Sequence, residues 1–161
     1  MKILKNKGVG LIEAIVVISI ISTSFAAVLG SAVFFLRGGL FAVDQVQALF
    51  LLDESAEAVR FMRDQGFTTN ITPLVGIGPQ YLTVSGSGWS ATTTNTTLLG
   101  KFSRTIEITE VYRRNSDDVI VPVSSGDPKT LDAGTVRLEI TIDWGGKSVS
   151  NTTYVSDLYE N

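Results

Sequence analysis

The hydrophobic positions of the chain are concentrated near its N-terminus. Residues 9–36 form an apolar run of 28 residues that contains one charged side chain, Glu13. As an α-helix this run would be about 42 Å long at ~1.5 Å per residue, which exceeds the ~30 Å hydrocarbon thickness of a bilayer. The run is also too long for a helix buried in the core of a small domain. The pattern therefore predicts a helix that crosses a membrane.

The helical period continues after this run, but with only one apolar face. Over residues 37–66 the charged side chains lie mostly on the other side of the predicted helix, and Gly66 is a suitable C-terminal cap. The apolar stripe consists of Leu49, Leu52, Ala56, Val59 and Met62. A one-sided stripe needs a surface to pack on, and the sheet of the same domain is the expected one.

From residue 67 onward the helical period disappears and strands are predicted. Residues 83–97 (TVSGSGWSATTTNTT) are polar and low in complexity, and we expect a loop there. A strand over residues 101–112 would place Phe102, Ile106, Ile108 and Tyr112 on one face. Residues 119–123 form a short β-branched run with a proline, which is typical of an edge strand.

The strongest strand signal lies near the C-terminus. Residues 124–134 are rich in turn formers, and residues 135–144 then alternate between apolar and polar side chains. The apolar face of this alternation contains Val136, Leu138, Ile140, Ile142 and Trp144. Gly145-Gly146 is a favoured hairpin turn into a last strand over residues 147–155. The expected fold is α+β: a long N-terminal helix packed on the dry face of a small antiparallel sheet.

Composition then narrows the functional classes. The chain has 161 residues, the length of one domain, and it contains neither Cys nor His. Disulfides, thiolate zinc sites and histidine-based catalysis are thereby excluded. The net charge of −3 disfavours a nucleic-acid partner. We expect no enzyme and no cofactor. Four aspartates, Asp117, Asp118, Asp127 and Asp132, lack EF-hand spacing and are better explained as a solvated acidic loop than as a calcium site.

A basic segment precedes the apolar run. Residues 1–8 (MKILKNKG) contain three lysines and no acid, so this end is expected to stay in the cytoplasm while the rest is exported. The start fits a signal peptide cut near Ala26, an uncleaved anchor, or a leader cut after Gly8 with the helix retained. A carboxylate deep in a bilayer costs about 2.5–3.5 kcal/mol. Only the third interpretation gives Glu13 a purpose, because a new amine at Val9 would lie about one helical turn away.

The segment from Lys7 to Glu13 (KGVGLIE), preceded by lysines and followed by an aliphatic run, resembles the processing site of type IV prepilins and pseudopilins. The resemblance implies that a prepilin peptidase cuts after Gly8 and methylates Val9. It further implies that Glu13 pairs with the amine of a neighbouring subunit and sets the register of a helical filament. Val9 and Gly10 stand where phenylalanine or methionine and threonine are commoner. The motif covers about 30 of the 161 residues.

The same resemblance implies a domain organisation: residues 1–8 as leader, 9–36 as transmembrane and assembly helix, 37–66 as its amphipathic continuation, and 67–161 as an extracytoplasmic β domain. The chain would be a structural subunit of a type IV pilus, or of a secretion or competence pseudopilus, and the C-terminal hairpin looks like that of minor subunits. In this family the region of Gly30, Gly38 and Gly39 often melts locally in the filament, which gives these glycines a hypothetical role.

The implied partners are other pilin subunits, the prepilin peptidase, the inner-membrane assembly platform, and membrane lipid before assembly. The implied location is the inner (cytoplasmic) membrane, crossed once with the leader in the cytoplasm, and later a periplasmic or extracellular filament. One alternative remains open at this point. A membrane-anchored or secreted adhesion domain with an ordinary signal sequence would carry the same apolar start.

Overall fold

The N-terminal part of the chain is one uninterrupted helix. The computed structural model describes residues 9–86 and 88–158, and α1 (Val9–Asp64) is an α-helix of 56 residues. Gly30, Gly38 and Gly39 lie within it without breaking it, although each costs about 1 kcal/mol relative to alanine. Internal contacts divide the chain after Gln45, so α1 contributes its first part to one unit and its second part to the other.

Short helical turns follow α1. Gly66 takes a positive φ of 142° and donates its N–H to the Arg63 carbonyl at 2.9 Å, so it caps the helix end where the sequence predicts it. Next come α2 (Phe67–Asn70) and the 3-10 helix η1 (Thr72–Leu74). Phe67 and Ile71 are buried, so this segment closes one end of the core.

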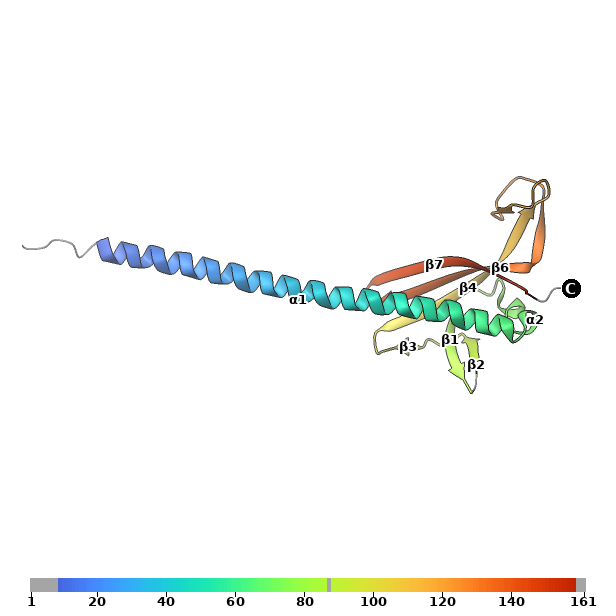
Figure 1. Ribbon diagram of the computed structural model, residues 1–161, viewed down its shortest axis with the longest axis horizontal. Helices are drawn as coiled ribbons and strands as arrows, with labels where there is room; N and C mark the ends of the chain where they lie inside the picture. The colour runs from blue at the N-terminus through green and yellow to red at the C-terminus, as the bar shows by residue number, and fades with distance from the viewer. Residues whose placement is uncertain (1–8, 87, 159–161) are drawn as a thin grey trace, which may run out of the picture. The chain divides into compact units, whose positions relative to one another are not determined.

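The rest of the chain is an antiparallel sheet, drawn in Figure 1. Its strands are β1 (Gln80–Ser85), β2 (Gly88–Thr92), β3 (Thr97–Leu98), β4 (Phe102–Arg114), β5 (Ile120–Val121), β6 (Lys129–Trp144) and β7 (Lys147–Ser156). Five strands run in the order β2-β1-β4-β6-β7, and the short β3 and β5 pair with β4. A long helix packed on a seven-stranded antiparallel sheet confirms the predicted α+β fold.

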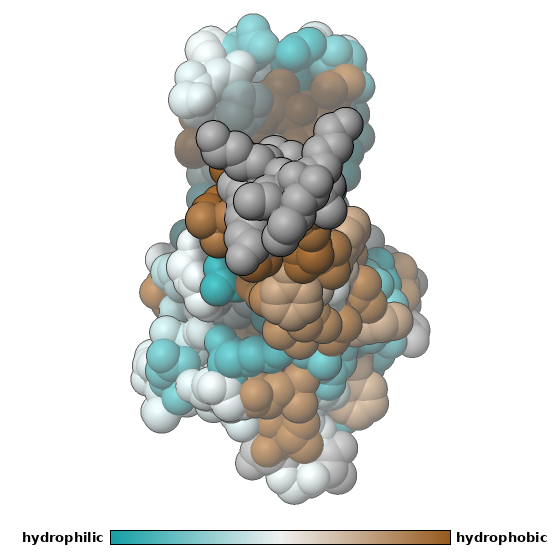
Figure 2. Space-filling view, turned by 90° about the vertical axis from the view of Figure 1, so that its left-hand side faces the viewer, coloured by the Kyte–Doolittle hydropathy of each residue, from teal (hydrophilic) through white to brown (hydrophobic). Residues whose placement is uncertain are grey.

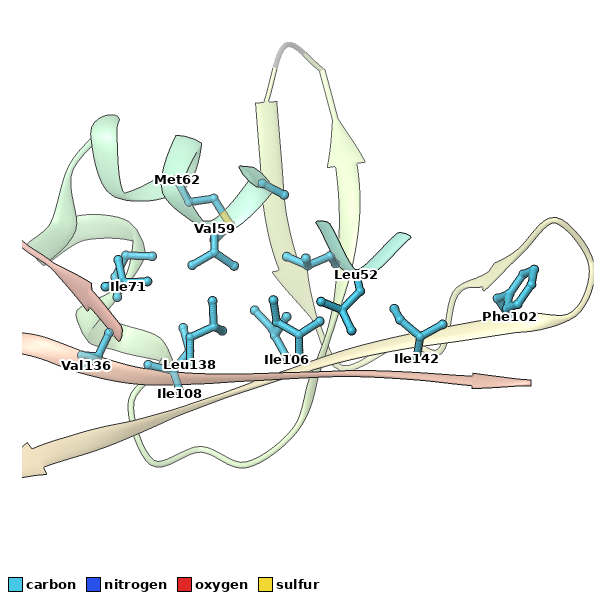
Figure 3. Packing of buried hydrophobic residues seen from close by; sticks show 14 of the residues in the cluster. Leu52, Val59, Met62, Ile71, Phe102, Ile106, Ile108, Val136, Leu138 and Ile142 are labelled. Carbon is cyan, nitrogen blue, oxygen red and sulfur yellow. The ribbon is translucent and has the colours of Figure 1, made fainter. Parts of the chain in front are cut away.

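The core lies between the second part of α1 and one face of the sheet. Figure 3 shows Leu52, Val59 and Met62 pointing toward apolar side chains of the strands. The buried positions of α1 are Ala48, Leu52, Ser55, Ala58, Val59 and Met62. The prediction is wrong for Leu49, which is 46% exposed, and Ala56 is only partly buried. Ala48 and Ser55 take their places because the line through residues 48, 52, 55, 59 and 62 follows the helical repeat more closely.

The C-terminal hairpin forms as predicted. All five apolar positions of β6 from Val136 to Trp144 are buried, with Leu138, Ile140 and Ile142 at 0% exposure. Gly145 and Gly146 have φ values of 52° and 75°, as a type I′ turn requires at both central positions. Strand β7 pairs with β6 without a shift in register.

The predicted loop over residues 83–97 is wrong, because most of it belongs to the β1–β2 hairpin. Leu82 of β1 is 1% exposed, and Trp89 and Ala91 of β2 pack against the core. Strand β1 also pairs with β4, through Gln80 with Ile106 and Tyr81 with Thr105. Strand β4 supplies main-chain hydrogen-bond partners and apolar contacts, which cannot be predicted from the polar sequence of residues 83–97 alone.

The predicted face of Tyr112 and the predicted loop over residues 124–134 are both wrong, and both lie near a shift in strand pairing. The pairing of β4 with β6 slips between Glu110 and Val111. Glu110 pairs with Val136 and Val111 pairs with Asp132, so three residues of β6 have no partner on β4 at this point. Beyond this irregularity the faces of β4 are exchanged, and Val111 is buried whereas Tyr112 is only partly buried. The expected loop over residues 124–134 is also shorter, since β6 begins at Lys129 and continues the pairing with β4. The predicted edge strand is present as β5 and ends just before Pro122.

Candidate functional site

The first part of α1 is an apolar surface on all sides. Its large hydrophobic side chains are exposed at consecutive as well as helically spaced positions, from Leu11 at 67% to Leu36 at 69%. Figure 2 views the molecule from this end of α1, where hydrophobic side chains lie on the surface. By length and composition, α1 is able to cross a membrane. An all-round apolar helix needs lipid or other apolar helices as its surroundings.

Three of the five hydroxyl groups in residues 9–36 donate hydrogen bonds to carbonyls of the helix itself. Ser19 donates to the Ile15 carbonyl at 2.8 Å, Thr23 to the Ser19 carbonyl at 3.0 Å, and Ser31 to the Ala27 carbonyl at 2.9 Å. Each bond joins residues four apart, so no partner outside the helix is needed. These bonds reduce the free-energy cost of placing the three hydroxyl groups in an apolar environment.

Glu13 is the one charged side chain of residues 9–36. It is exposed near the start of α1 with apolar neighbours, including Ile12 at 67% exposure. Among the described residues, no ion pair involves its carboxylate. Val9 is the first residue of α1, one helical turn before Glu13. Gly8 lies outside the described residues, so the cleavage site stays a prediction, as does the pairing of Glu13 with an amine.

A buried arginine joins α1 to the sheet in the second unit. The Arg104 side chain is 2% exposed on the core side of β4, where its Nη1 lies 3.2 Å from Oε2 of Glu54 on α1. Its guanidinium also lies over the Trp89 ring, 4.9 Å from the centroid. Burial lowers the pKa of Arg104, and the charge and hydrogen bond of Glu54 only partly oppose this shift. The arginine interrupts the apolar alternation between Phe102 and Ile106, a signal that sequence reasoning overlooked.

The four aspartates considered for calcium surround two arginines instead. Arg113 Nε lies 2.6 Å from Asp132, and its Nη1 lies 3.8 Å from Asp118. Arg114 contacts Asp117 and Asp127, each at 3.0 Å. Burial raises the pKa of Asp132, but hydrogen bonds from Arg113 and Thr135, together with the Arg113 charge, outweigh burial and lower it. Within the described part of the chain no cluster of acidic side chains is suited to a metal ion.

A surface groove of about 700 Å³ lies beside this cluster. Its mainly apolar lining includes Tyr112, Val121, Val123 and Tyr154. The Tyr112 hydroxyl donates to Glu110 at 2.7 Å, and this hydrogen bond raises the pKa of the tyrosine. Lys129 donates to three loop carbonyls at one wall, including that of Ser125 at 2.6 Å. The Tyr112 hydroxyl and the Lys129 ammonium are thus already bonded within the β domain.

Comparison with protein-family models, curated proteins and solved structures finds no match to this chain. The features that bear on function are therefore the apolar first part of α1, the Glu13 carboxylate within it, and the antiparallel sheet.

Proposed function

We propose that this chain is a type IV pilin-like subunit, inserted in the inner membrane and polymerised into a filament through α1. Prepilin peptidase would remove residues 1–8 and methylate Val9. The apolar helix would lie in lipid before assembly and among the helices of other subunits afterwards. The machine is a pilus or a secretion or competence pseudopilus. The β domain would stay on the exported side, in the periplasm or outside the cell.

The length of the apolar helix surface supports a filament over a simple anchor. Exposed apolar side chains continue past residue 36, with Leu40 at 70%, Val43 at 53% and Phe50 at 69% exposure. The stretch from Val9 to Phe50 measures about 63 Å at ~1.5 Å per residue, roughly twice the hydrocarbon thickness of a bilayer. Lipid covers only about half of such a surface. Helices of neighbouring subunits have the length and the apolar character to cover all of it.

Glu13 gives the proposal its assembly mechanism. An unpaired carboxylate in the hydrocarbon region is costly, so its presence favours a state in which it has a cationic partner. The amine released by cleavage before Val9 is such a partner when it belongs to a neighbouring subunit. A buried ion pair of this kind selects one axial register, because every other register leaves both charges unpaired.

Mass spectrometry of the mature protein tests the cleavage. The proposal expects an N-terminus at methylated Val9, whereas an ordinary signal peptide or anchor gives a start near Ala27 or at Met1. Gly8→Ala should keep the leader attached. Gly10→Ala is the matched control, because a Cβ at Gly10 meets no atom within 4 Å, and it should be processed normally. Normal processing of Gly8→Ala contradicts the proposed site.

A second experiment separates processing from assembly. Glu13→Ala and the isosteric Glu13→Gln should both be cleaved after Gly8 and remain in the membrane without entering filaments. Glu13→Asp retains the charge and should assemble at least in part. Filament fractions are sheared from cells and quantified by immunoblot against the membrane pool. Wild-type incorporation of Glu13→Gln shows that the charge does not set the register.

A further inference from the structure

Strand β7 (Lys147–Ser156) is a long free edge of the sheet. It pairs with β6 in one continuous register from Trp144–Lys147 to Thr135–Ser156, and among the described strands no other pairs with its outer side. The opposite edge, β2, has only five residues. A ten-residue edge presents a row of main-chain donors and acceptors that another strand can use.

The residues that face outward follow from the hydrogen-bond pattern. The N–H of Asp157 donates to the Gly134 carbonyl at 2.8 Å, so this pair is hydrogen-bonded. Bonded and non-bonded pairs alternate in an antiparallel ladder. The even-numbered residues of β7 therefore direct their N–H and C=O groups away from β6, and these residues are also exposed. They are Ser148, Ser150, Thr152, Tyr154 and Ser156.

This edge lacks the features that usually prevent strand addition. Charged side chains, prolines, bulges and short length are the common protections of an edge strand. Between Lys147 and Asp157 the sequence SVSNTTYVS contains neither a charge nor a proline, and β7 carries no bulge. Elsewhere in the same sheet, β5 is followed at once by Pro122 and is two residues long.

The geometry points to a second copy of this chain as the partner of β7, paired antiparallel about a two-fold axis through Thr152. In this register Lys147 of each copy lies opposite Asp157 of the other, so opposite charges meet at both ends. A parallel pair in register would place Lys147 against Lys147. The antiparallel register leaves no like charges opposite each other. It joins the outward-facing residues in about ten main-chain hydrogen bonds.

The two-fold contact is distinct from assembly through α1. An isologous contact uses the same patch on both copies and closes on itself, so it does not extend a filament. Between subunits of two different filaments it joins the filaments side by side. Between free subunits it produces a dimer linked through the β domains. The inference does not depend on cleavage after Gly8 or on the role of Glu13.

Single cysteines test the register, because the natural chain has no Cys. The full chain is purified in detergent micelles and mildly oxidised. In Thr152→Cys the two Cα atoms would lie about 5.5 Å apart, within the range of a disulfide. In Ser150→Cys the two Cα atoms would be offset by four residues, about 13 Å along the strand direction, which is beyond the reach of a disulfide. We expect Thr152→Cys to form covalent dimers at least ~10-fold faster than Ser150→Cys.

Controls separate this contact from association of the helices. A mixture of Ser150→Cys and Tyr154→Cys should cross-link, since these residues are opposite each other in the proposed register. Adding Ser150→Pro to Thr152→Cys removes an outward N–H and should reduce the rate to that of Ser150→Cys alone. Adding Glu13→Ala should leave the rate unchanged. Equal rates for Thr152→Cys and Ser150→Cys are the signature of random contact between micelle-bound copies, and they would overturn the inference.

Discussion

The ion pair between Arg104 and Glu54 gives a sharp prediction about stability. Arg104 is 2% exposed, whereas Glu54 is 49% exposed, so one partner of the pair has lost its water and the other has not. Glu54→Gln would leave the guanidinium buried beside Trp89 without a counter-charge. A hydrogen bond to a charged group contributes about 1.5–3 kcal/mol, and a fully buried pair loses about 3–5 kcal/mol when one partner is removed. Because Glu54 is half in water, we expect a loss of about 2 kcal/mol.

Replacing the arginine of this pair should lower the free energy of unfolding by less than replacing Glu54. Arg104→Met removes the buried charge and fills much the same space with apolar atoms, an exchange that is often near neutral for buried ion pairs. It loses the contact with Trp89, worth about 0.5–1 kcal/mol. The double variant should resemble Arg104→Met alone, because Glu54 then has no partner to lose. The two substitutions are therefore expected to be strongly non-additive.

Urea unfolding of the full chain in micelles, followed by tryptophan fluorescence and circular dichroism, measures these differences. Glu57→Gln is the matched control. Glu57 lies on the same helix and pairs with Arg60, but their side chains are 71% and 46% exposed, so a change below ~0.5 kcal/mol is expected. The reasoning is refuted if Glu54→Gln is as mild as Glu57→Gln, or if Arg104→Met is the more destabilising of the two.

Three other predictions follow from burial, turn geometry and charge. Leu52→Ala should lower the free energy of unfolding by about 3 kcal/mol, because it leaves a cavity in the core. The Leu49 side chain is 46% exposed, so Leu49→Ala should lower it by less than ~1 kcal/mol, and equal losses would contradict the packing. Gly146→Ala should cost about 1 kcal/mol at its φ of 75°, whereas Gly126→Ala, with open space around its Cβ position, should be nearly silent in thermal unfolding. The pKa of Asp132 is lowered in the folded state, so its stabilising effect is complete above the unfolded pKa of about 3.9 and is lost as pH falls through the folded pKa. Asp132→Asn should therefore reduce the loss of stability at acidic pH, and an unchanged loss argues against the pair with Arg113.

Local patterns were sufficient to predict the main elements. The apolar run of residues 9–36 and the amphipathic stretch after it are visible because a helix repeats every 3.6 residues. The alternation from Val136 to Trp144 is equally clear for a strand with one buried face. Gly145-Gly146 suits a tight turn that needs positive φ twice. These features depend on residues close in sequence, so they need no knowledge of the fold.

The structure decided whatever depends on a partner distant in sequence. Ala48 rather than Leu49 faces the core because the sheet meets α1 along one line, and a neighbouring residue is rotated by about 100° from it. The polar residues of β1 and β2 become strands because β4 offers them an edge. The slip after Glu110 places Val111 in a buried position, which depends on where β6 runs.

The residues of the candidate site likewise fall into those that the sequence predicts and those that only the structure reveals. Glu13 was evident from sequence because a single carboxylate in an apolar run is conspicuous without any structure. Arg104 was not recognised, since its meaning depends on Glu54, fifty residues earlier in the chain. The free edge of β7 was likewise hidden, because sequence alone predicts a strand but not which of its sides lacks a neighbour. Sequence therefore determined the main elements and the single carboxylate of the apolar run. Tertiary structure determined which groups are paired and which surfaces stay open, because pairing and exposure are properties of neighbours in space.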